Sequence, residues 1–486
     1  MHRVARLALP LVVASALVNP VAGQDEPQDG RRDGPWAEST PVAPNLADLL
    51  DRIERLEGDK VAMQDEIAEL RAQTGDTWLT EERANQVRLL VEDVLTDADT
   101  RSSLLQDGAT AGWDGRFFLA SADGRFRLNV GGQMQFRWIW NYHDQPPTYV
   151  YGFENSRTKL VFSGHMFSRD LTFKIQGDFG PQSSPTGESG ANVLQDAWVR
   201  WMLNSDWSLR FGQFKLPYNR EFLVDSMYQQ VLERSLVSER GNIGRSPGIE
   251  LTYGGRDSTV SVALSNGGEF NVAPGVGIPT DVANVPVLVG SSSGVESDYA
   301  ITARYQRKFA GTWDQFRQLT SPPGEGFALL WGLAGHYQRN DPHSAGAARD
   351  HSSWVAATTD ISIQWGGANL FSSFVWNYFD IPSFNTHTFG WTLQGGMYFT
   401  EKLEGYARVE WGRFIINGDP FQKDLAVVTL GGNYYLDGQD VKLSADVGFG
   451  LNPVSTFWSS DMAAWRTDLP TVRPQIVVRT QFQLLF

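Results

Sequence analysis

The chain has 486 residues, no cysteine and a formal net charge of −15 at neutral pH. The lack of cysteine excludes disulfides, thiolate metal sites and a lipidated N-terminal cysteine. An acidic chain without a basic tail argues against a nucleic-acid partner. Beyond the N-terminus, no apolar run reaches the ~18 residues that a membrane-spanning helix needs.

The first residues are typical of a secretory signal peptide. Basic residues precede the apolar stretch 7–18, and small residues permit cleavage before Gln24. This pattern places the signal peptide at 1–23, because the alternative, a membrane anchor, needs a longer apolar stretch. Residues 24–44 are rich in Pro, Gly and Asp and predict a disordered linker.

A coiled coil is predicted at 45–73. Apolar residues recur in alternating steps of three and four from Leu46 to Leu70, and Lys60 is the polar exception. This narrow seam favours self-association over the alternative, a single amphipathic helix that lies on the following domain. Residues 74–112 are expected to form a helical connector, with a change to a period of two near their end.

Residues 125–140 alternate over an unusually long stretch. Every second residue from Phe126 to Trp140 is apolar or glycine, and the residues between them are polar or glycine except for Ile139. Side chains of a strand alternate between its two faces, and a strand that crosses a tilted membrane wall needs about 9–11 residues. Length and alternation together predict a transmembrane strand whose arginines face a water-filled lumen.

Sixteen such segments predict an all-β fold, a 16-stranded antiparallel transmembrane β-barrel over 113–486. The α-helical coiled coil is expected to precede this barrel as an N-terminal periplasmic segment. Short turns alternate with long loops, as in bacterial outer-membrane barrels, and only the link 310–325 is long on the turn side. Both chain ends then lie in the periplasm. The last strand ends on Phe486, which resembles the assembly signal of bacterial barrel proteins. The expected strand cores are 125–140, 153–167, 170–180, 193–203, 206–215, 247–254, 258–266, 297–309, 326–338, 352–365, 367–379, 386–400, 402–414, 422–436, 438–450 and 474–486.

Charge on the expected lumenal face is uneven, because basic residues dominate the first five strands. A charge on the lipid face costs about 2–4 kcal/mol near the midplane, which favours an inward direction. Rings or ladders of Arg and Lys select anions, and the planar fork of Arg suits phosphate. Alternatively, these residues only neutralise lumenal carboxylates or bind lipopolysaccharide near the rim. The expected substrate-binding residues are Arg127, Arg137, Arg157, Lys159, Lys174, Arg200 and Arg210.

The link 216–246 is a candidate constriction loop. Its aromatic residues Tyr218, Phe222 and Tyr228 are suited to anchor it against the barrel wall. The sequence is equally compatible with an outward lid. The constriction candidates are Arg220, Arg234, Arg240 and Arg245.

Two stretches resemble the phosphate-selective porin O/P family of outer-membrane anion porins. They are FENSRTKLVFSGHMFSRDLTFKIQGDFG at 153–180 and LQDAWVRWMLNSDWSLRFGQFKLPYNREF at 194–222. The runs Glu233-Arg234-Ser235 and Gly-Arg-Ser-Pro-Gly from Gly244 are similar to the family as well. The resemblance implies a sixteen-stranded trimeric channel, with an arginine ladder and a lysine cluster in its phosphate- or polyphosphate-selective members. Lumenal lysines are few in this sequence.

These features predict an outer-membrane porin for passive diffusion of small anions such as phosphate or polyphosphate. The alternatives are a general or sugar-permeable porin and a structural tether between the outer membrane and the cell wall. The expected partners are outer-membrane lipid and lipopolysaccharide, small anions, two further copies in a homotrimer, and the cell wall through the coiled coil. No catalytic constellation emerges, so no enzyme activity, cofactor or metal is expected, and the Asp and His residues of 341–351 are interpreted as a solvated loop.

Overall fold

The computed structural model describes the residues 109–180, 193–268, 297–340, 352–381, 384–417 and 423–486, together with Gly58, Lys60 and 62–66. The chain divides into two units, Met1–Ala72 and Gln73–Phe486. In the first unit Gly58, Lys60 and 62–66 are helical. The predicted signal peptide, linker and most of the coiled coil and connector lie outside the described residues, so these assignments stay predictions. None of the described helices is long and apolar enough to cross a membrane.

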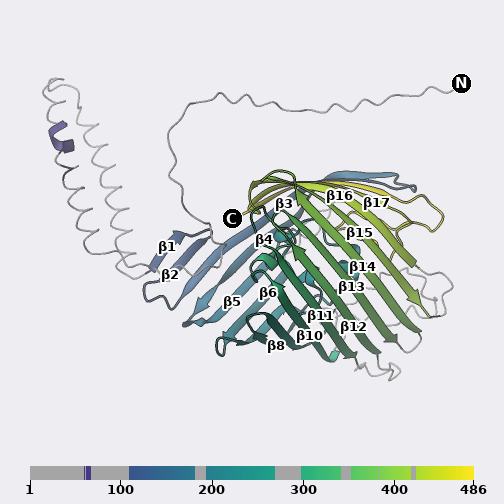
Figure 1. The fold of residues 1–486 in the computed structure, drawn as a ribbon, viewed down its shortest axis with the longest axis horizontal. Coiled ribbons are helices and arrows are strands. Elements are labelled where there is room, and N and C mark those ends of the chain that lie inside the picture. The colour runs from purple at the N-terminus through teal and green to yellow at the C-terminus, as the bar shows by residue number, and fades with distance from the viewer. Residues whose placement is uncertain are drawn as a thin grey trace. The chain divides into compact units, whose positions relative to one another are not determined.

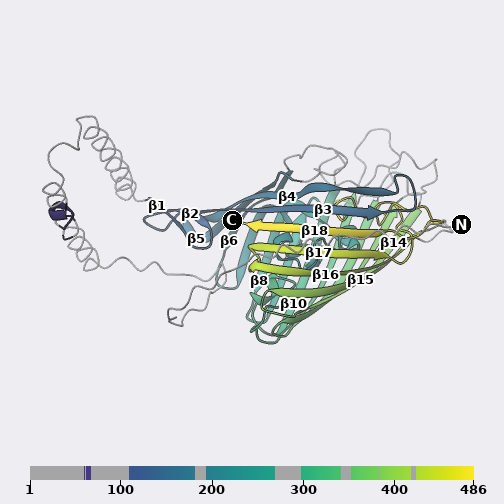
Figure 2. The same ribbon diagram turned by 90° about the horizontal axis from the view of Figure 1, so that it is seen from above.

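Sixteen antiparallel strands of the second unit form a closed barrel (Figure 1). Each strand pairs with its neighbours in sequence, and β18 closes the ring by pairing with β3. Figure 2 shows β18 between β3 and β17 in the wall. The barrel strands are β3 (Arg127–Tyr142), β4 (Tyr149–Met166), β5 (Ser168–Asp178), β6 (Val193–Met202), β7 (Trp207–Lys215), β8 (Arg245–Gly254), β9 (Ser258–Ser265), β10 (Ser297–Ala310), β11 (Ala328–Asn340), β12 (Ser352–Gln364), β13 (Ala368–Ile381), β14 (Phe384–Tyr398), β15 (Leu403–Ile416), β16 (Lys423–Asp437), β17 (Val441–Gly450) and β18 (Ile476–Leu485).

The predicted fold class is confirmed, and each of the sixteen expected segments overlaps one strand of the barrel. The alternation of β3 explains why it forms a membrane wall. Met134 and Phe136 are exposed on the outer surface, whereas Gln135 and Arg137 are buried inside. Ile139, the apolar exception, also points inward and packs in a buried cluster with residues of the last long loop. The outward row thus meets lipid, and the inward row is available to the lumen.

A short hairpin precedes the barrel and was not among the predicted strands. It consists of β1 (Ala109–Trp113) and β2 (Phe117–Ser121), so the last residues of the expected helical connector are extended. The β2 strand pairs with β3 over Arg127–Val130, next to the stretch of β3 that β18 covers. The period of two near residue 112 was the sequence signal for this hairpin.

Three links fold into the barrel and fill much of its interior. Two of them, 216–244 and 451–475, come from the end of the barrel that carries the long loops. The third, 311–327, joins β10 to β11 and comes from the opposite end, where the other links between described strands are short turns. Each of the three links contains fully buried side chains, for example Tyr218, Thr320 and Trp458. The shape of the interior therefore depends on these links as well as on the wall.

Candidate functional site

The loop 216–244 crosses the lumen as a folded segment. It contains α3 (Arg220–Leu223), the 3-10 turn η1 (Ser226–Tyr228) and α4 (Leu236–Gly241). Ser235 caps α4 by accepting a hydrogen bond from the backbone N–H of Ser238. Both carboxylate oxygens of Glu221 accept hydrogen bonds from Ser235, one from its backbone N–H and one from its hydroxyl, each at 2.6 Å. These internal hydrogen bonds give the loop a defined shape. The loop folds into the lumen and does not form an outward lid.

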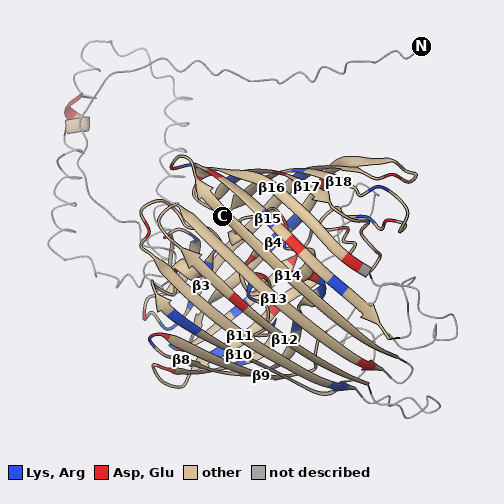
Figure 3. Ribbon diagram, turned by 45° about the vertical axis from the view of Figure 1, so that its right-hand side comes forward, with Lys and Arg blue, Asp and Glu red and all other residues tan. Residues whose placement is uncertain are grey.

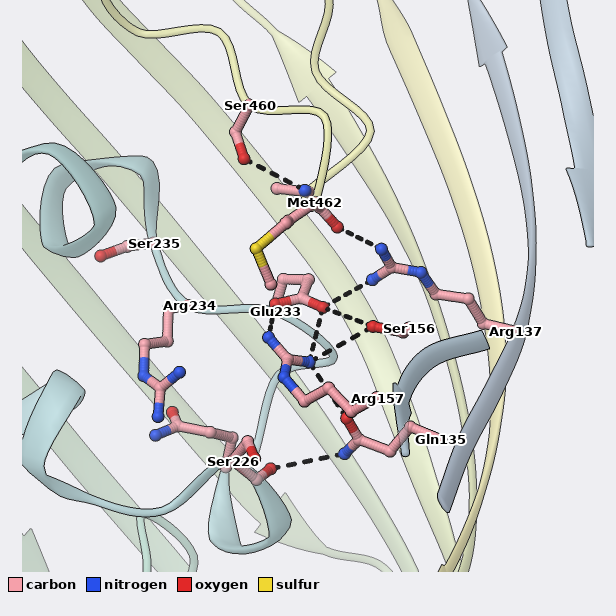
Figure 4. Close-up of polar contacts among 12 residues, drawn as sticks. Gln135, Arg137, Ser156, Arg157, Ser226, Glu233, Arg234, Ser235, Ser460 and Met462 are labelled. Carbon is pink, nitrogen blue, oxygen red and sulfur yellow. Dashed lines mark hydrogen bonds and ion pairs between the residues drawn. The ribbon is translucent and has the colours of Figure 1, made fainter. Parts of the chain in front are cut away.

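Glu233 ties the loop to the wall at β3 and β4 (Figure 4). Arg157 donates to both of its carboxylate oxygens, at 2.8 and 2.7 Å, and Arg137 donates to one of them at 2.6 Å. Burial alone would raise the pKa of Glu233, but the two guanidinium groups outweigh it and hold the pKa far below its ordinary value. Arg137 also pairs with Glu154. Arg137 and Arg157 are therefore anchors of the loop, each with a carboxylate as partner.

The residues next to Glu233 reach β14 and β15, across the ring from β7, where the loop begins. The backbone N–H of Leu236 donates to the carboxylate of Glu410 on β15 at 2.6 Å, and Arg408 donates to the carbonyl of Glu233 at 2.6 Å. Val237 lies so close to Gly390 on β14 that a Cβ there would meet its methyl group at 2.4 Å. Only glycine permits this approach. The loop thus spans the lumen between two walls and stays closely packed against both.

The last long loop, 451–475, covers the interior near the same end of the barrel. Trp458 packs over Gly412 and Trp465 over Gly448, where a Cβ would in each case lie 2.6 Å from the indole ring. Arg479 of β18 donates to the carbonyl of Ala463 at 3.0 Å. Since both tryptophans are fully buried, this loop closes the lumenal space next to β15–β18.

Most charges on the lumenal faces of β10–β18 and the adjoining loop are buried and balanced, whereas Lys308 at the end of β10 is 12% exposed and pairs with Asp257. The guanidinium of Arg304 donates to both carboxylate oxygens of Asp360, at 2.9 and 2.8 Å, and Arg479 pairs with Asp446 in the same way at 2.8 Å. We call this region the closed side. Its five cations and five carboxylates are at most 5% exposed: Arg220, Arg304, Arg408, Lys442 and Arg479 with Glu221, Asp360, Glu404, Glu410 and Asp446.

Charges on the lumenal faces of β4–β8 and the adjoining loop residues differ from those of the closed side, because several are partly exposed to solvent and cations outnumber carboxylates. We call this region the basic side. Apart from the balanced cluster of Arg137, Glu154, Arg157 and Glu233 that anchors the loop, its described residues include seven cations and four carboxylates, a surplus of three positive charges. They are Lys159, Lys174, Arg200, Arg210, Lys215, Arg234 and Arg245 with Asp178, Asp196, Asp225 and Glu250. The side chains of Lys215, Arg210, Arg245 and Lys174 remain 11, 14, 17 and 19% exposed.

Three cations of the basic side gather around one aromatic ring. The Nζ of Lys215 and the guanidinium carbons of Arg234 and Arg245 lie 5.5, 5.2 and 5.6 Å from the centre of the Phe222 ring. This is within the ~6 Å range of cation–π attraction. Arg234 also donates to the carbonyls of Glu221 and Val224, at 3.2 and 2.9 Å. The loop therefore places Arg234 beside two cations of the wall.

Asp225 is the loop's own carboxylate in this region. It pairs with Lys215 at 2.7 Å. Burial would raise the pKa of Asp225, but Lys215 and Lys174 lower it well below its ordinary value. The carboxylate stays ionised at neutral pH and cancels one positive charge of the basic side.

The predicted substrate-binding residues separate into three groups in the structure. Lys159, Lys174, Arg200 and Arg210 belong to the basic side, whereas Arg137 and Arg157 hold Glu233. Arg127 pairs with Asp114 of the β1–β2 hairpin and lies over the Phe118 ring, beyond the stretch of β3 that pairs with β18. Their roles in solute binding stay predictions.

The four constriction candidates also differ in position. Arg234 and Arg245 lie on the basic side, and Arg245 pairs with Asp196 at 2.8 Å. Arg220 reaches the closed side, where it donates to the hydroxyl of Ser362 at 2.9 Å. Arg240 donates to the carbonyl of Ser459 and joins the two long loops. Figure 3 shows Lys and Arg in blue and Asp and Glu in red at isolated positions along strands that are otherwise tan.

Sequence reasoning missed Lys215. Strict alternation places Lys215 on the outward face of β7, together with exposed Phe211. The chain turns into the lumen at Leu216, directly after the strand, and Lys215 follows it to meet Asp225. A lysine at the last position of a strand before an inward loop was the available signal.

A comparison with models of known protein families tests the resemblance to the porin O/P family. Residues 125–283, about a third of the chain, match the family model described as phosphate-selective porin O and P. The predicted resemblance to this family is confirmed. The barrel fold and this match relate the chain to outer-membrane porins.

Solved structures of outer-membrane proteins are similar to this chain at low sequence identity. The anion-selective porin from Comamonas acidovorans is 13% identical with a TM-score of 0.50, and the alignment covers 74% of this chain and 99% of that one. The outer membrane channel DcaP of Acinetobacter baumannii is 11% identical with a TM-score of 0.48, covering 77% and 100%. OmpT of Vibrio cholerae is 10% identical with a TM-score of 0.49, covering 74% and 98%. A search of curated proteins found no match.

Proposed function

We propose that this porin conducts small anions, with phosphate or polyphosphate as the expected solutes, along the basic side of its lumen. The observation that carries the proposal is the surplus of three positive charges on the basic side, against none on the closed side. Ions pass where charged groups retain access to water, and partly exposed cations attract anions into a narrow aqueous space.

The mechanism is passive. An anion exchanges part of its hydration shell for contacts with Lys and Arg side chains, and the planar guanidinium groups of Arg210 and Arg245 suit a tetrahedral oxyanion. Carboxylates beside them, such as Asp196 and Glu250, keep each contact weak. Weak binding at several positions permits exit as well as entry. No step needs chemistry or an energy source, and we expect no enzyme activity.

The assembly is part of the proposal. The family resemblance supports a homotrimer, with lipid and lipopolysaccharide around it. The end of the barrel with the short turns then faces the periplasm, as in bacterial outer-membrane barrels, together with the N-terminal segment. In that orientation the predicted coiled coil is positioned to contact the cell wall.

Single-channel recording in a planar bilayer tests the function. We expect the reversal potential in a potassium chloride gradient to show anion preference, and added phosphate to block the chloride current. A cation preference would overturn the proposal in favour of a general or sugar-permeable porin. Absence of conductance would favour the structural tether.

A further inference from the structure

The link between β10 and β11 breaks the regular pattern of the barrel. The other described links between barrel strands at this end span at most four residues, whereas this one covers 311–327. A long link here has no need to be ordered, yet Phe316, Leu319, Thr320 and Ser321 are all buried. Burial of this extent requires that the segment lies against other parts of the protein.

Its contacts lie on the lumenal faces of the strands β12 and β13. The side chain of Gln364 donates to the carbonyl of Gln315 at 3.1 Å, and Asn369 donates to the carbonyl of Leu319 at 2.8 Å. Leu319 also packs in a buried apolar cluster with Phe371, a lumen-facing residue of β13. The segment therefore occupies space inside the barrel next to these two strands.

A buried carboxylate fixes the tip of the segment. Glu404 on β15 accepts hydrogen bonds from the Thr320 hydroxyl at 2.5 Å and from the Gln230 side chain at 2.7 Å through one oxygen. Its other oxygen accepts from the Tyr435 hydroxyl at 2.6 Å and from Asn433 at 2.9 Å. Four donors from three parts of the chain satisfy this carboxylate, so losing one of them is costly.

The segment also braces the loop 216–244. Arg220 donates to the carbonyl of Phe316 at 2.6 Å, and the backbone N–H of Leu319 donates to the carbonyl of Tyr228 at 3.2 Å. Val224 of the loop belongs to the same apolar cluster as Leu319. The two inward segments thus meet inside the barrel, although they come from opposite ends.

We propose that residues 311–327 form a resident plug that blocks the lumen along β12–β15 and thereby sets the largest solute that passes. The plug places apolar and hydrogen-bonded groups where a simple sixteen-stranded barrel of this type would hold water. It leaves the basic side as the open path. The inference rests on the proposed function only in that both concern a conducting pore.

Shortening the segment tests this inference most directly. Replacing residues 312–325 by Asn-Gly leaves the pairing of β10 with β11, which extends to Ala310 and Leu329, in place. We expect single-channel conductance to rise roughly twofold or more, because widening the aqueous path lowers its resistance. We also expect liposomes with the shortened protein to admit neutral oligosaccharides that the wild type excludes. Heat-dependent migration on a gel checks that the barrel is folded.

A pair of matched point variants covers the case in which the shortened protein does not fold. Thr320→Val removes one donor to Glu404, whereas Thr312→Val alters an exposed threonine of the same segment. We expect increased current noise and a higher size limit for Thr320→Val alone. Unchanged conductance and size limit in every folded variant would overturn the plug. Neutral-solute uptake tests the plug, whereas the reversal potential of the wild type tests the anion channel. A wider size limit in the variants together with no anion preference in the wild type would refute only the anion channel.

Discussion

Arg210 and Arg479 are both lumen-facing arginines paired with a carboxylate at 2.7–2.8 Å, but their surroundings differ. Arg210 keeps 14% of its side chain exposed on the basic side, whereas Arg479 is fully buried on the closed side. The comparison teaches that residue type and strand face do not define a solute path. The inward segments decide which arginines still meet water, and those they cover become structural.

The largest expected effect separates stability from selectivity. Arg479→Met leaves the carboxylate of Asp446 buried without its main partner, and breaking such a pair costs about 3–5 kcal/mol. Arg210→Met is the matched comparison: its partner Glu250 is also buried, but it interacts with the charge of Arg200 as well, so we expect a smaller loss of stability. Urea unfolding in detergent measures both. Equal losses of stability would contradict the division into two sides.

The next effect concerns ion selectivity. Replacing Lys174, Arg234 and Arg245 together by Gln lowers the surplus on the basic side from three to zero. We expect the permeability ratio of anion to cation to fall toward one, since the attraction of the lumen for anions depends on this surplus. The matched control replaces Lys308, Arg317 and Arg413, none of them on the basic side, by Gln. A triple variant with wild-type reversal potential would refute the basic side as the path.

The wall of the barrel could be predicted from the sequence, because alternation along strands such as β3 is a local property. What covers the wall could not, because it depends on segments far away in the chain. Alternation places both Arg137 and Arg210 on the lumenal face, yet only Arg137 pairs with Glu233 of the inward loop. One signal was present in β13, where Phe371, Val375 and Phe379 face the lumen and are buried. Apolar residues on both faces of a barrel strand indicate that an inward segment covers it.

A smaller effect comes from the loop carboxylate of the basic side. Asp225→Asn raises the surplus from three to four, so we expect stronger anion preference. Since Lys215 and Lys174 hold the pKa of Asp225 below its ordinary value against the effect of burial, its charge and its contribution to stability persist above about pH 4. Both are lost only as the pH falls through the lowered pKa.

Reversal potentials at about pH 5 and pH 8 check this expectation. The difference between Asp225→Asn and the wild type should be the same at both values. Asp144→Asn, on an exposed loop, is the control. A difference that disappears at pH 5 would mean that Asp225 is already protonated there, and that its lysine partners are too weak to hold the charge.

The smallest expected effect concerns Arg127, which strand alternation alone assigns to the lumen. Its guanidinium pairs with Asp114 of the hairpin, and both side chains are substantially exposed, so the pair contributes about 1 kcal/mol or less. We expect Arg127→Gln to leave the reversal potential unchanged, whereas Arg245→Gln, the same substitution on the basic side, should reduce anion preference. Parallel bilayer recordings of the two variants measure this. If Arg127→Gln has the larger effect, the path of the anion extends past the hairpin, and the limits of the basic side need to be redrawn to include β3.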